Sequence, residues 1–460
     1  MPGSFTGYVG RGAADHGALS TPASPSAEPS SEQSASATRQ TMDHLFRHEY
    51  ARLVAILTRQ LGSARLPLVE DVVQDALLRA AQVWPCRGLP ANPTAWLLTT
   101  ARNRARDICR RDQRWRGSEA TISHLIESTA AQAEGAAAAT FENEIRDAEL
   151  RMMFVCCHPD LSSDAQLALI LKTLAGFGEQ EIATAFLVSR ATIAKRLVRA
   201  RKFLRDADVS TELPVESELH DRLGTVLHAL YLLFSEGFEA STGERVIRNE
   251  LCREADRLLT ALATWGPGAK PETFALGALF AFHQARLPVR LDSDGDPVIL
   301  ADQDRRQWDQ GQLRRGMKLL SASAQGERLS RYHIEAGIAA CHSLAASYDQ
   351  TDWPHIAKLY GDLATIAPSP AVSINRAIAI ARAEGAGSGL QHHATDVDAA
   401  LVDDYHLFHA ARADMLSEIG DPAAAAAYKR AIELAPLAAE RRSLRSRIAD
   451  LSKPRRKNQK

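Results

Sequence analysis

Apolar residues recur every three or four positions along nearly the whole chain from residue 45 onward. This spacing places them on one face of an α-helix, and short breaks rich in Gly and Pro separate one such run from the next. One segment, VRLDSDGDPVIL over residues 289–300, differs: an Asp/Gly cluster lies between two short apolar runs, which favours a small hairpin. The predicted fold class is therefore all-α, with one small hairpin.

Length and composition limit the kinds of protein that this chain can be. Its 460 residues are enough for roughly three domains. No apolar run reaches the ~18 residues of a membrane helix, so we expect no membrane contact. The six cysteines have neither disulfide-framework nor zinc spacing, which fits a reducing cytoplasm.

The net charge of −1 conceals two basic segments. Residues 42–116 hold 13 arginines against 7 acidic residues, and residues 190–205 hold seven basic residues and no acid. Such concentrated charge in a neutral chain favours nucleic-acid contact more strongly than a basic average would.

The first basic segment follows two amphipathic helices, expected over residues 45–61 and 68–84. The outer face of the second of these helices carries Glu70, Asp71, Gln74, Asp75 and Arg79. A third helix begins at Asn92, a natural N-cap followed by Pro93. This helix carries more arginines than solubility requires, so phosphate contact explains them more simply than a solvated face does. They are Arg102, Arg104, Arg106, Arg110, Arg111, Arg114 and Arg116.

The second basic segment, QEIATAFLVSRATIAKRLVRARKFLR over residues 180–205, predicts a helix-turn-helix. Ile182 and Phe186 share one apolar face, Ile193 and Leu197 share the next, and Ser189 can cap the second helix. The second helix of this motif presents its N-terminal side chains to the major groove. A basic helix that is merely solvated remains the alternative. The candidate DNA contacts are Arg190, Thr192, Lys195, Arg196 and Arg199.

Composition divides the rest of the chain into segments. Residues 1–41 are rich in Ser, Ala, Pro and Gly and are expected to be a disordered tail, with Met42 as an alternative start. The basic modules, 42–116 and 141–208, are joined by an Ala-rich linker over 117–140. A helical extension is expected over 215–330, helical repeats over 331–450, and a basic tail over 451–460.

The repeats rest on two similar stretches, YGDLATIAP and YKRAIELAP, which end at Pro368 and Pro436. These prolines are 68 residues apart, twice the 34-residue tetratricopeptide (TPR) period. Ile356 and Ala424 occupy matching positions upstream of them. The shared spacing predicts a TPR-like helical array.

No segment has the pattern of an active site, a metal site or a cofactor site. The stretch CCHP at residues 156–159 contains adjacent cysteines, which do not spread round a tetrahedral ion as CxxC does. The DSDGD cluster does not fit a calcium loop. An enzyme built from Glu236, Asp294, Asp296 and Asp304 is a distant alternative, because no nucleophile–base pair accompanies these acids. We expect no catalysis and no cofactor.

The two basic modules resemble an RNA polymerase sigma factor of the extracytoplasmic-function (ECF) group of the sigma-70 family. FRHEYARLVAILTRQLG, LVEDVVQDALLRAAQVWP and NPTAWLLTTARNRARDICRR are similar to its region 2, and LSSDAQLALILKTLAGFGEQEIATAFLVSRATIAKRLVRARKFLR is similar to its region 4. ALYLLFSEGFEAS, TDWPHIAKLYGDLATIAP and YHLFHAARADMLSEIGDPAAAAAYKRAI resemble the C-terminal extension of the subgroup that carries TPR repeats. The resemblance covers about residues 42–450.

This resemblance implies a role for each module. Region 2 would bind the β′ clamp helices of core RNA polymerase through Asp71, Gln74, Asp75 and Arg79. The loop over 85–91 and the start of the third helix would capture an unstacked base of melted promoter DNA, using Asn92, Trp96, Arg102, Asn103 and Arg106. Region 4 would contact the minus-thirty-five element through the five residues named above and would meet the β flap. The linker would thread through the polymerase.

The resemblance also implies a cytoplasmic protein, associated with the nucleoid through RNA polymerase, that directs promoter recognition and performs no catalysis. The extension would regulate it through a protein partner or an intramolecular contact. The main alternative is a stand-alone helix-turn-helix regulator with a TPR sensor. Such a regulator needs neither the arginine-rich first module nor the exposed acidic helix before it.

Overall fold

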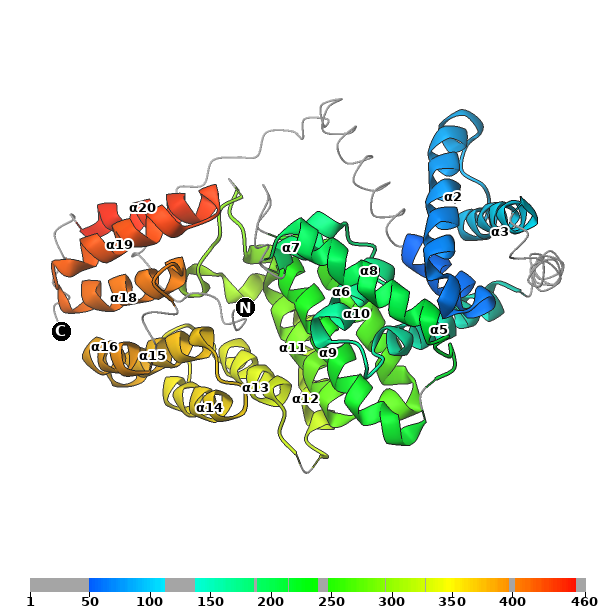
Figure 1. The fold of residues 1–460 in the computed structure, drawn as a ribbon. Coiled ribbons are helices and arrows are strands. Elements are labelled where there is room, and N and C mark those ends of the chain that lie inside the picture. The colour runs from blue at the N-terminus through cyan, green and yellow to red at the C-terminus, as the bar shows by residue number, and fades with distance from the viewer. Residues whose placement is uncertain are drawn as a thin grey trace, which may run out of the picture. The chain divides into compact units, whose positions relative to one another are not determined.

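The computed structural model describes residues 49–111, 137–185, 188–213, 215–238, 247–293, 295–326, 328–396 and 402–451. Over these residues the regular elements are helices, which confirms the all-α fold class (Figure 1). The predicted hairpin consists of one isolated antiparallel bridge, between Leu291 and Pro297. The chain divides into two compact units, of which the first extends to Leu233 and the second begins at Phe234.

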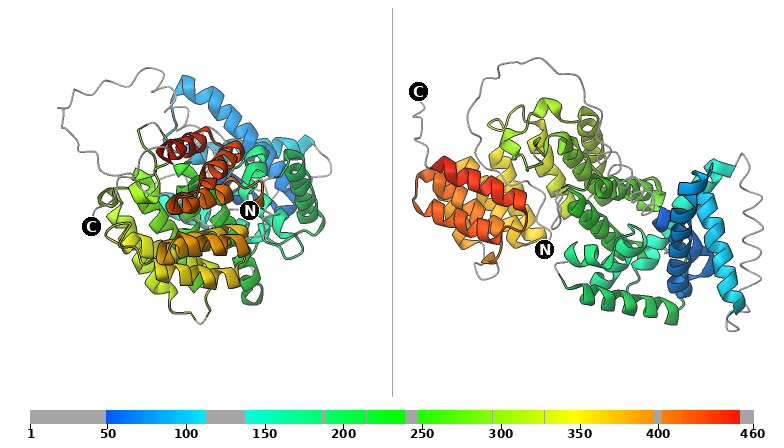
Figure 2. Two further views of the ribbon diagram at one scale, coloured as in Figure 1. Left: turned by 90° about the vertical axis from the view of Figure 1, so that its left-hand side faces the viewer. Right: turned by 90° about the horizontal axis from the view of Figure 1, so that it is seen from above.

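The N-terminal module is a small helical bundle. It consists of a helix over residues 49–61, η1 (Ser63–Arg65), α2 (Leu66–Arg87) and α3 (Pro93–Arg111). The helices lie side by side and are drawn in blue and cyan in Figures 1 and 2. Leu53, Val69, Val73, Leu97 and Ala101 are each completely buried in the core of the bundle.

Local sequence signals set the ends of these helices. The Asn92 side chain accepts a hydrogen bond from the Ala95 amide at 3.0 Å, so the predicted N-cap of α3 is confirmed. The predicted end of α2 at Trp84 is wrong, because the helix continues through Pro85 to Arg87. It ends at Gly88, whose φ of 82° lies in the left-handed region that favours glycine. The loop before α3 is therefore shorter than the predicted segment 85–91.

The next module contains α5 (Ala137–Cys156), α6 (Ser163–Thr173), α7 (Glu179–Ala185) and α8 (Arg190–Asp206). The helix-turn-helix prediction rests in part on Phe186, which lies outside the described residues. The Val188 amide donates to the Ala183 carbonyl at 2.9 Å, and Ser189 Oγ accepts from the Thr192 amide at 3.2 Å. These bonds end α7 and begin α8, as the Ser189 cap predicts.

The remaining helices pack largely against their neighbours in the sequence. α9 (Glu216–Phe238) spans the end of the first unit and the start of the second. The helices that follow are α10 (Asn249–Thr264), α11 (Pro271–Arg286), α12 (Gln310–Ser323), α13 (Arg331–Leu344), α14 (Trp353–Ile366), α15 (Pro370–Glu384), α16 (Ala386–Thr395), α18 (His406–Ile419), α19 (Ala423–Leu434) and α20 (Ala438–Leu451), with short 3-10 turns η3 (Gly266–Gly268), η4 (Leu287–Val289), η5 (Leu300–Asp302) and η6 (Arg305–Gln307). Within the described ranges no helix has the length and apolarity needed to cross a bilayer.

Helices α14 and α15, and helices α18 and α19, form neighbouring antiparallel pairs (Figures 1 and 2). The matching repeat positions are buried in both stretches. Tyr360 and Ile356 are buried in one cluster, and Tyr428 and Ala424 are buried in another. The stretch around Tyr360 lies on α14, which packs against the following helix, whereas the stretch around Tyr428 lies on α19, which packs against the preceding helix.

Candidate nucleic-acid and polymerase interface

Helix α8 separates an apolar face from a basic face. Its buried positions are Ile193, Leu197, Ala200 and Leu204. The residues predicted to contact DNA lie on the rest of the helix surface: Arg190, Lys195 and Arg199 are exposed, and Thr192 and Arg196 are half-buried. All five residues therefore come from one helix with a packed inner side and are accessible at its surface.

The basic side chains of α8 have different electrostatic partners. Arg196 Nη2 lies 2.5 Å from Asp164 Oδ2 on α6, and Arg190 Nε lies 3.2 Å from Glu179 Oε2 on α7. Lys195 and Arg199 have no carboxylate partner within 4 Å among the described residues. Their positive charge is therefore available for phosphate, whereas Arg190 and Arg196 are also held by their own module.

The predicted DNA-contacting residues of α3 are not equally accessible. Asn92 and Asn103 are exposed, and Asn103 accepts a hydrogen bond from Arg106 Nη2 at 3.3 Å. Trp96 is half-buried and meets Trp84 edge to face, with 5.6 Å between the ring centroids. Arg102 differs, because it is only 5% exposed and its Nε donates to Gln60 Oε1 at 3.1 Å.

The position of Arg102 follows from helical spacing. It comes four residues after Leu98 and three residues before Ala105, both of which are buried. A side chain at that position points toward the core of the bundle rather than toward a ligand on the surface. In this structure Arg102 holds α3 against the helix over residues 49–61.

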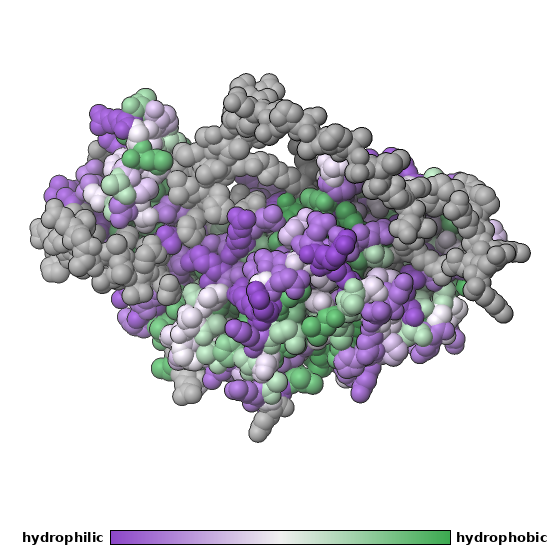
Figure 3. All heavy atoms as spheres, turned by 180° about the vertical axis from the view of Figure 1, so that it is seen from behind, coloured by the Kyte–Doolittle hydropathy of each residue, from purple (hydrophilic) through white to green (hydrophobic). Residues whose placement is uncertain are grey.

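The outer side of α2 has a mixed acidic and apolar surface. Asp71, Gln74, Asp75 and Arg79 are all exposed, as the polymerase-binding prediction requires. Leu78 lies among them and is 62% exposed, a feature that was not predicted from the sequence. The free end of α2, at the upper left in Figure 3, likewise shows both hydrophilic and hydrophobic residues. A single exposed leucine is common on protein surfaces, so Leu78 adds an apolar point to this face and does not by itself mark an interface.

Glu70 was predicted to lie on this outer face, and that prediction is wrong. It is 4% exposed, and its carboxylate accepts a hydrogen bond from the Tyr50 hydroxyl at 3.2 Å. Arg201 of α8 pairs with the same carboxylate, with Nε 2.7 Å from Oε2 and Nη2 2.9 Å from Oε1. Burial and the neighbouring Glu70 charge raise the pKa of Tyr50.

The cysteines of the CCHP stretch and the acidic residues of the enzyme alternative do not form a metal site or a catalytic site where the structure describes them. Cys156 and Cys157 are buried, and burial raises the pKa of Cys156 to about 12. Asp296, Asp304 and Glu236 pair with three different arginines, Arg442, Arg306 and Arg248. Asp294 lies outside the described residues. The described ranges contain no group of three potential metal ligands among His, Cys, Asp and Glu.

Comparison with known proteins assigns roles to both basic modules. The family model for Sigma-70 region 2 matches residues 45–116, and the model for Sigma-70 region 4 matches residues 151–204. A family of unknown function, DUF6596, matches residues 222–324. Uncharacterized protein R00370 from Rhizobium meliloti (strain 1021) is 34% identical over 390 residues, which cover 84% of this chain and 90% of that protein. No solved structure matches the chain.

These matches connect the geometry to a biological role. Sigma-70 regions 2 and 4 are parts of a non-enzymatic family that binds core RNA polymerase and promoter DNA in transcription initiation. The basic face of α8 lies within the region 4 match, and α2 and α3 lie within the region 2 match. The role of the DUF6596 part is not given by its family. The chain therefore contains regions 2 and 4 of the sigma-70 family of transcription initiation factors, followed by a C-terminal DUF6596 extension.

Proposed function

We propose that the chain is an ECF-type sigma factor whose C-terminal extension regulates promoter-specific initiation. In this proposal the face of α2 formed by Asp71, Gln74, Asp75 and Arg79 binds the β′ clamp helices, and Leu78 adds an apolar contact. The observation that carries the proposal is the separation of this face from the basic face of α8. A protein that only binds DNA does not need an exposed acidic helix.

The DNA-contacting part of the proposal involves two helices. Asn92, Trp96, Asn103 and Arg106 hold an unstacked base and the phosphates of the melted strand, and Arg102 positions α3 beneath them. Five residues of α8 contact the minus-thirty-five duplex, where region 4 also meets the β flap: Arg190, Thr192, Lys195, Arg196 and Arg199. Such a protein acts in the cytoplasm, on the nucleoid.

The extension is proposed to hold a TPR-like array that binds a protein partner or another part of this chain. Two observations support this proposal: the 68-residue separation of Pro368 and Pro436, and the matching burial of Tyr360 and Tyr428. Helices paired in this way present extended surfaces, which repeat proteins use for binding.

In vitro transcription with purified core polymerase tests the proposal. We expect the full chain to direct initiation from a promoter that the core enzyme alone does not use. An Asp71→Lys variant should bind core polymerase more weakly, whereas Lys318→Ala, an exposed change in α12, should behave like the natural chain. Sequence-specific binding to duplex DNA without any initiation would instead indicate a stand-alone regulator.

Removing the extension tests its regulatory role. The cut belongs after Leu233 rather than after residue 208, because Arg222 Nη1 donates to the Phe154 carbonyl at 3.3 Å within the first unit. We expect a fragment ending at Leu233 to initiate at a rate different from that of the full chain. Equal rates at equal polymerase occupancy would contradict regulation by the extension.

A further inference from the structure

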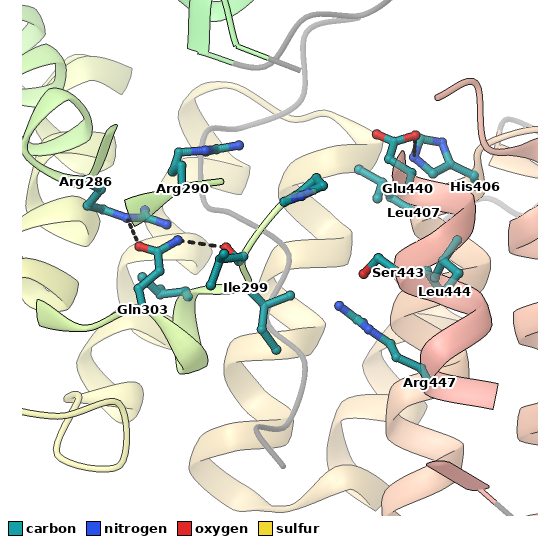
Figure 4. Close-up of a pocket in the computed structure, with 14 residues that line it drawn as sticks. Arg286, Arg290, Ile299, Gln303, His406, Leu407, Glu440, Ser443, Leu444 and Arg447 are labelled. Atoms are coloured by element: carbon teal, nitrogen blue, oxygen red, sulfur yellow. Dashed lines mark hydrogen bonds and ion pairs between the residues drawn. The ribbon is translucent and has the colours of Figure 1, made fainter. Parts of the chain in front are cut away.

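Several arginines of this chain are held in place by neighbouring groups, which limits what else each guanidinium can bind. In a hollow of the second unit, between the segment that follows α11 and helices α18 and α20, Arg286 donates to Gln303 and Arg447 pairs with Asp414 (Figure 4). The cavity volume of this hollow is about 90 Å³, whereas ligand pockets typically measure about 300–1,000 Å³. These arginines therefore contribute to packing, and the arginines of region 4 are held in a different way.

Arg190, the first residue of α8, is held by the inner end of its guanidinium. Its Nε lies 3.2 Å from Glu179 Oε2 on α7, while its side chain is 68% exposed. Neither Nη1 nor Nη2 of Arg190 makes a hydrogen bond with a described residue. The carboxylate thus restricts the direction of the guanidinium and leaves its outer edge, with two N–H groups side by side, facing away from the protein.

The other cations of α8 are arranged differently. Arg196 is held by its outer end, because its Nη2 lies 2.5 Å from Asp164 Oδ2, and its side chain is only 23% exposed. The side chains of Lys195 and Arg199 have no carboxylate within 4 Å among the described residues, so no ion pair there fixes their direction. Of these four cations, Arg190 combines a fixed direction with an accessible outer edge.

The local structure of the turn fixes the backbone from which Arg190 projects. Ser189 Oγ accepts a hydrogen bond from the Thr192 amide at 3.2 Å and lies 2.9 Å from Thr192 Oγ1. Glu179 is the first residue of α7, so its ion pair with Arg190 joins the starts of two helices across the turn. Ala191 follows, is exposed and carries only a methyl group, which leaves room for close approach to a base pair.

We propose that Arg190 reads a guanine in the minus-thirty-five element and that Glu179 is the positioning residue that directs it. In a helix-turn-helix, the first residues of the second helix face the base edges in the major groove. Guanine presents the O6 and N7 acceptors there, which match the two outer N–H groups of an arginine. Lys195 and Arg199 contribute affinity through phosphates without this preference. The inference rests on the proposed sigma function and deepens it by naming the base and the two residues.

Selection of duplexes from a randomised promoter library by the polymerase–sigma complex tests the role of Arg190. We expect the natural chain to prefer guanine at one base pair, and Arg190→Ala to reduce that preference at least about tenfold while the preferences at other positions remain. Arg205→Ala is the matched control, because Arg205 Nε lies 3.3 Å from Asp206 Oδ1 at the other end of α8, about 22 Å away by helical rise. This control should keep the whole pattern. An unchanged pattern in a folded Arg190→Ala variant would overturn the assignment, as would a natural chain without a guanine preference.

Two substitutions of Glu179 separate a positioning role from a structural one. Glu179→Ala should reduce the guanine preference without weakening binding to non-specific duplex, because it removes a negative charge beside the phosphates. Glu179→Gln keeps an oxygen that accepts from Arg190 Nε, so it should retain part of the preference. A merely structural role would instead weaken binding to all sequences together and lower the thermal unfolding temperature, with the base preference unchanged.

In vitro transcription with the same variants distinguishes failure of this inference from failure of the proposed function. Polymerase-dependent initiation by Arg190→Ala with the natural base preference would overturn the role of Arg190 and leave the sigma function intact. A natural chain that supports no initiation would overturn the sigma function. Selection with the chain alone then decides whether Arg190 reads guanine in a stand-alone regulator, and the same loss of preference in Arg190→Ala is the expected result.

Discussion

Arginine residues of this chain with similar sequence surroundings differ widely in what they contact. Arg199 is exposed on α8, whereas Arg201, two residues later, lies against the buried Glu70. Arg102 lies on the buried side of α3. Arg104, two residues later on the same helix, is exposed, and its Nε lies 2.7 Å from Asp75 Oδ2. The count of arginines in a segment therefore overstates the number that are free to bind phosphate.

The exposed position of Arg199 leads to a prediction at the level of one side chain. Arg199→Ala should weaken promoter binding by the polymerase–sigma complex, because it removes one phosphate contact. In a plot of the logarithm of the binding constant against the logarithm of the salt concentration, the slope should decrease in magnitude by about 1. Binding assays at several salt concentrations measure this slope, and Lys318→Ala on α12 is the matched surface control. Loss of binding without a change in slope would indicate a structural role for Arg199.

The lowered pKa of the buried His342 ring leads to a prediction about how the stability of the chain depends on pH. Its pKa is about 3 in the folded chain and 6.5 in the reference state. Between these values the unfolded chain binds more protons than the folded chain, so stability should fall as pH decreases from 7 toward 4. The centroids of the His342 and Trp353 rings are 5.2 Å apart. His342→Phe keeps an aromatic ring against Trp353 and removes the nitrogen that binds the proton. Thermal unfolding at pH 7 and pH 5 should show a smaller decrease for this variant, while His283 and His393 retain part of it.

At the level of single elements, helix ends with a polar cap were predicted well from the sequence. The caps at Asn92 and Ser189 depend on residues only three positions away, so local sequence determines them. The end of α2 was not predicted, because proline normally interrupts a helix but Pro85 lies inside this one. Among its described residues the region 289–300 forms one bridge and no longer strand pairing, because a short apolar run does not by itself supply a strand partner.

The site residues were predicted less completely than the elements that carry them. Exposed positions on α8 and on the outer side of α2 follow from helical period alone. The burial of Glu70 depends on Arg201, which is 131 residues away in the chain. The hollow beside α11 joins residues from Arg286 to Arg447. Helical periodicity carries no information about such distant pairs.

Two glycines of α16 give a prediction about helix packing. A Cβ at Gly389 would lie 2.4 Å from Ala381 Cβ and 2.8 Å from the Ala377 carbonyl, so Gly389→Ala should push α16 away from α15. A cost of about 1–3 kcal/mol is expected. Gly387→Ala meets no described atom within 4 Å and should stabilise the helix by about 0.5–1 kcal/mol. Urea unfolding of both variants measures the two free energies, and a stabilised Gly389→Ala variant would contradict the close packing.

At the level of the whole molecule, the two sigma regions contact one another within the first unit. Arg201 of α8 pairs with Glu70 of α2, and Ser63 Oγ donates to the Val209 carbonyl. Arg59 Nη1 also lies 2.9 Å from Asp147 Oδ2, although both of these side chains are more exposed. Exposed ion pairs contribute little to stability, so the buried Glu70–Arg201 pair is the main electrostatic link between the two regions.

This link can be measured by a double-mutant cycle. Arg201→Ala leaves a buried carboxylate without its cation and should cost about 3 kcal/mol of unfolding free energy. Arg205→Ala, an exposed change four residues later on α8, should cost at most about 0.5 kcal/mol. After Glu70→Ala, the further change Arg201→Ala should cost much less, with a coupling energy of about 1–3 kcal/mol. Urea unfolding of the four chains gives this energy. Additive effects of the two changes would show that regions 2 and 4 are held together by apolar packing and the remaining hydrogen bonds, without a contribution from this ion pair.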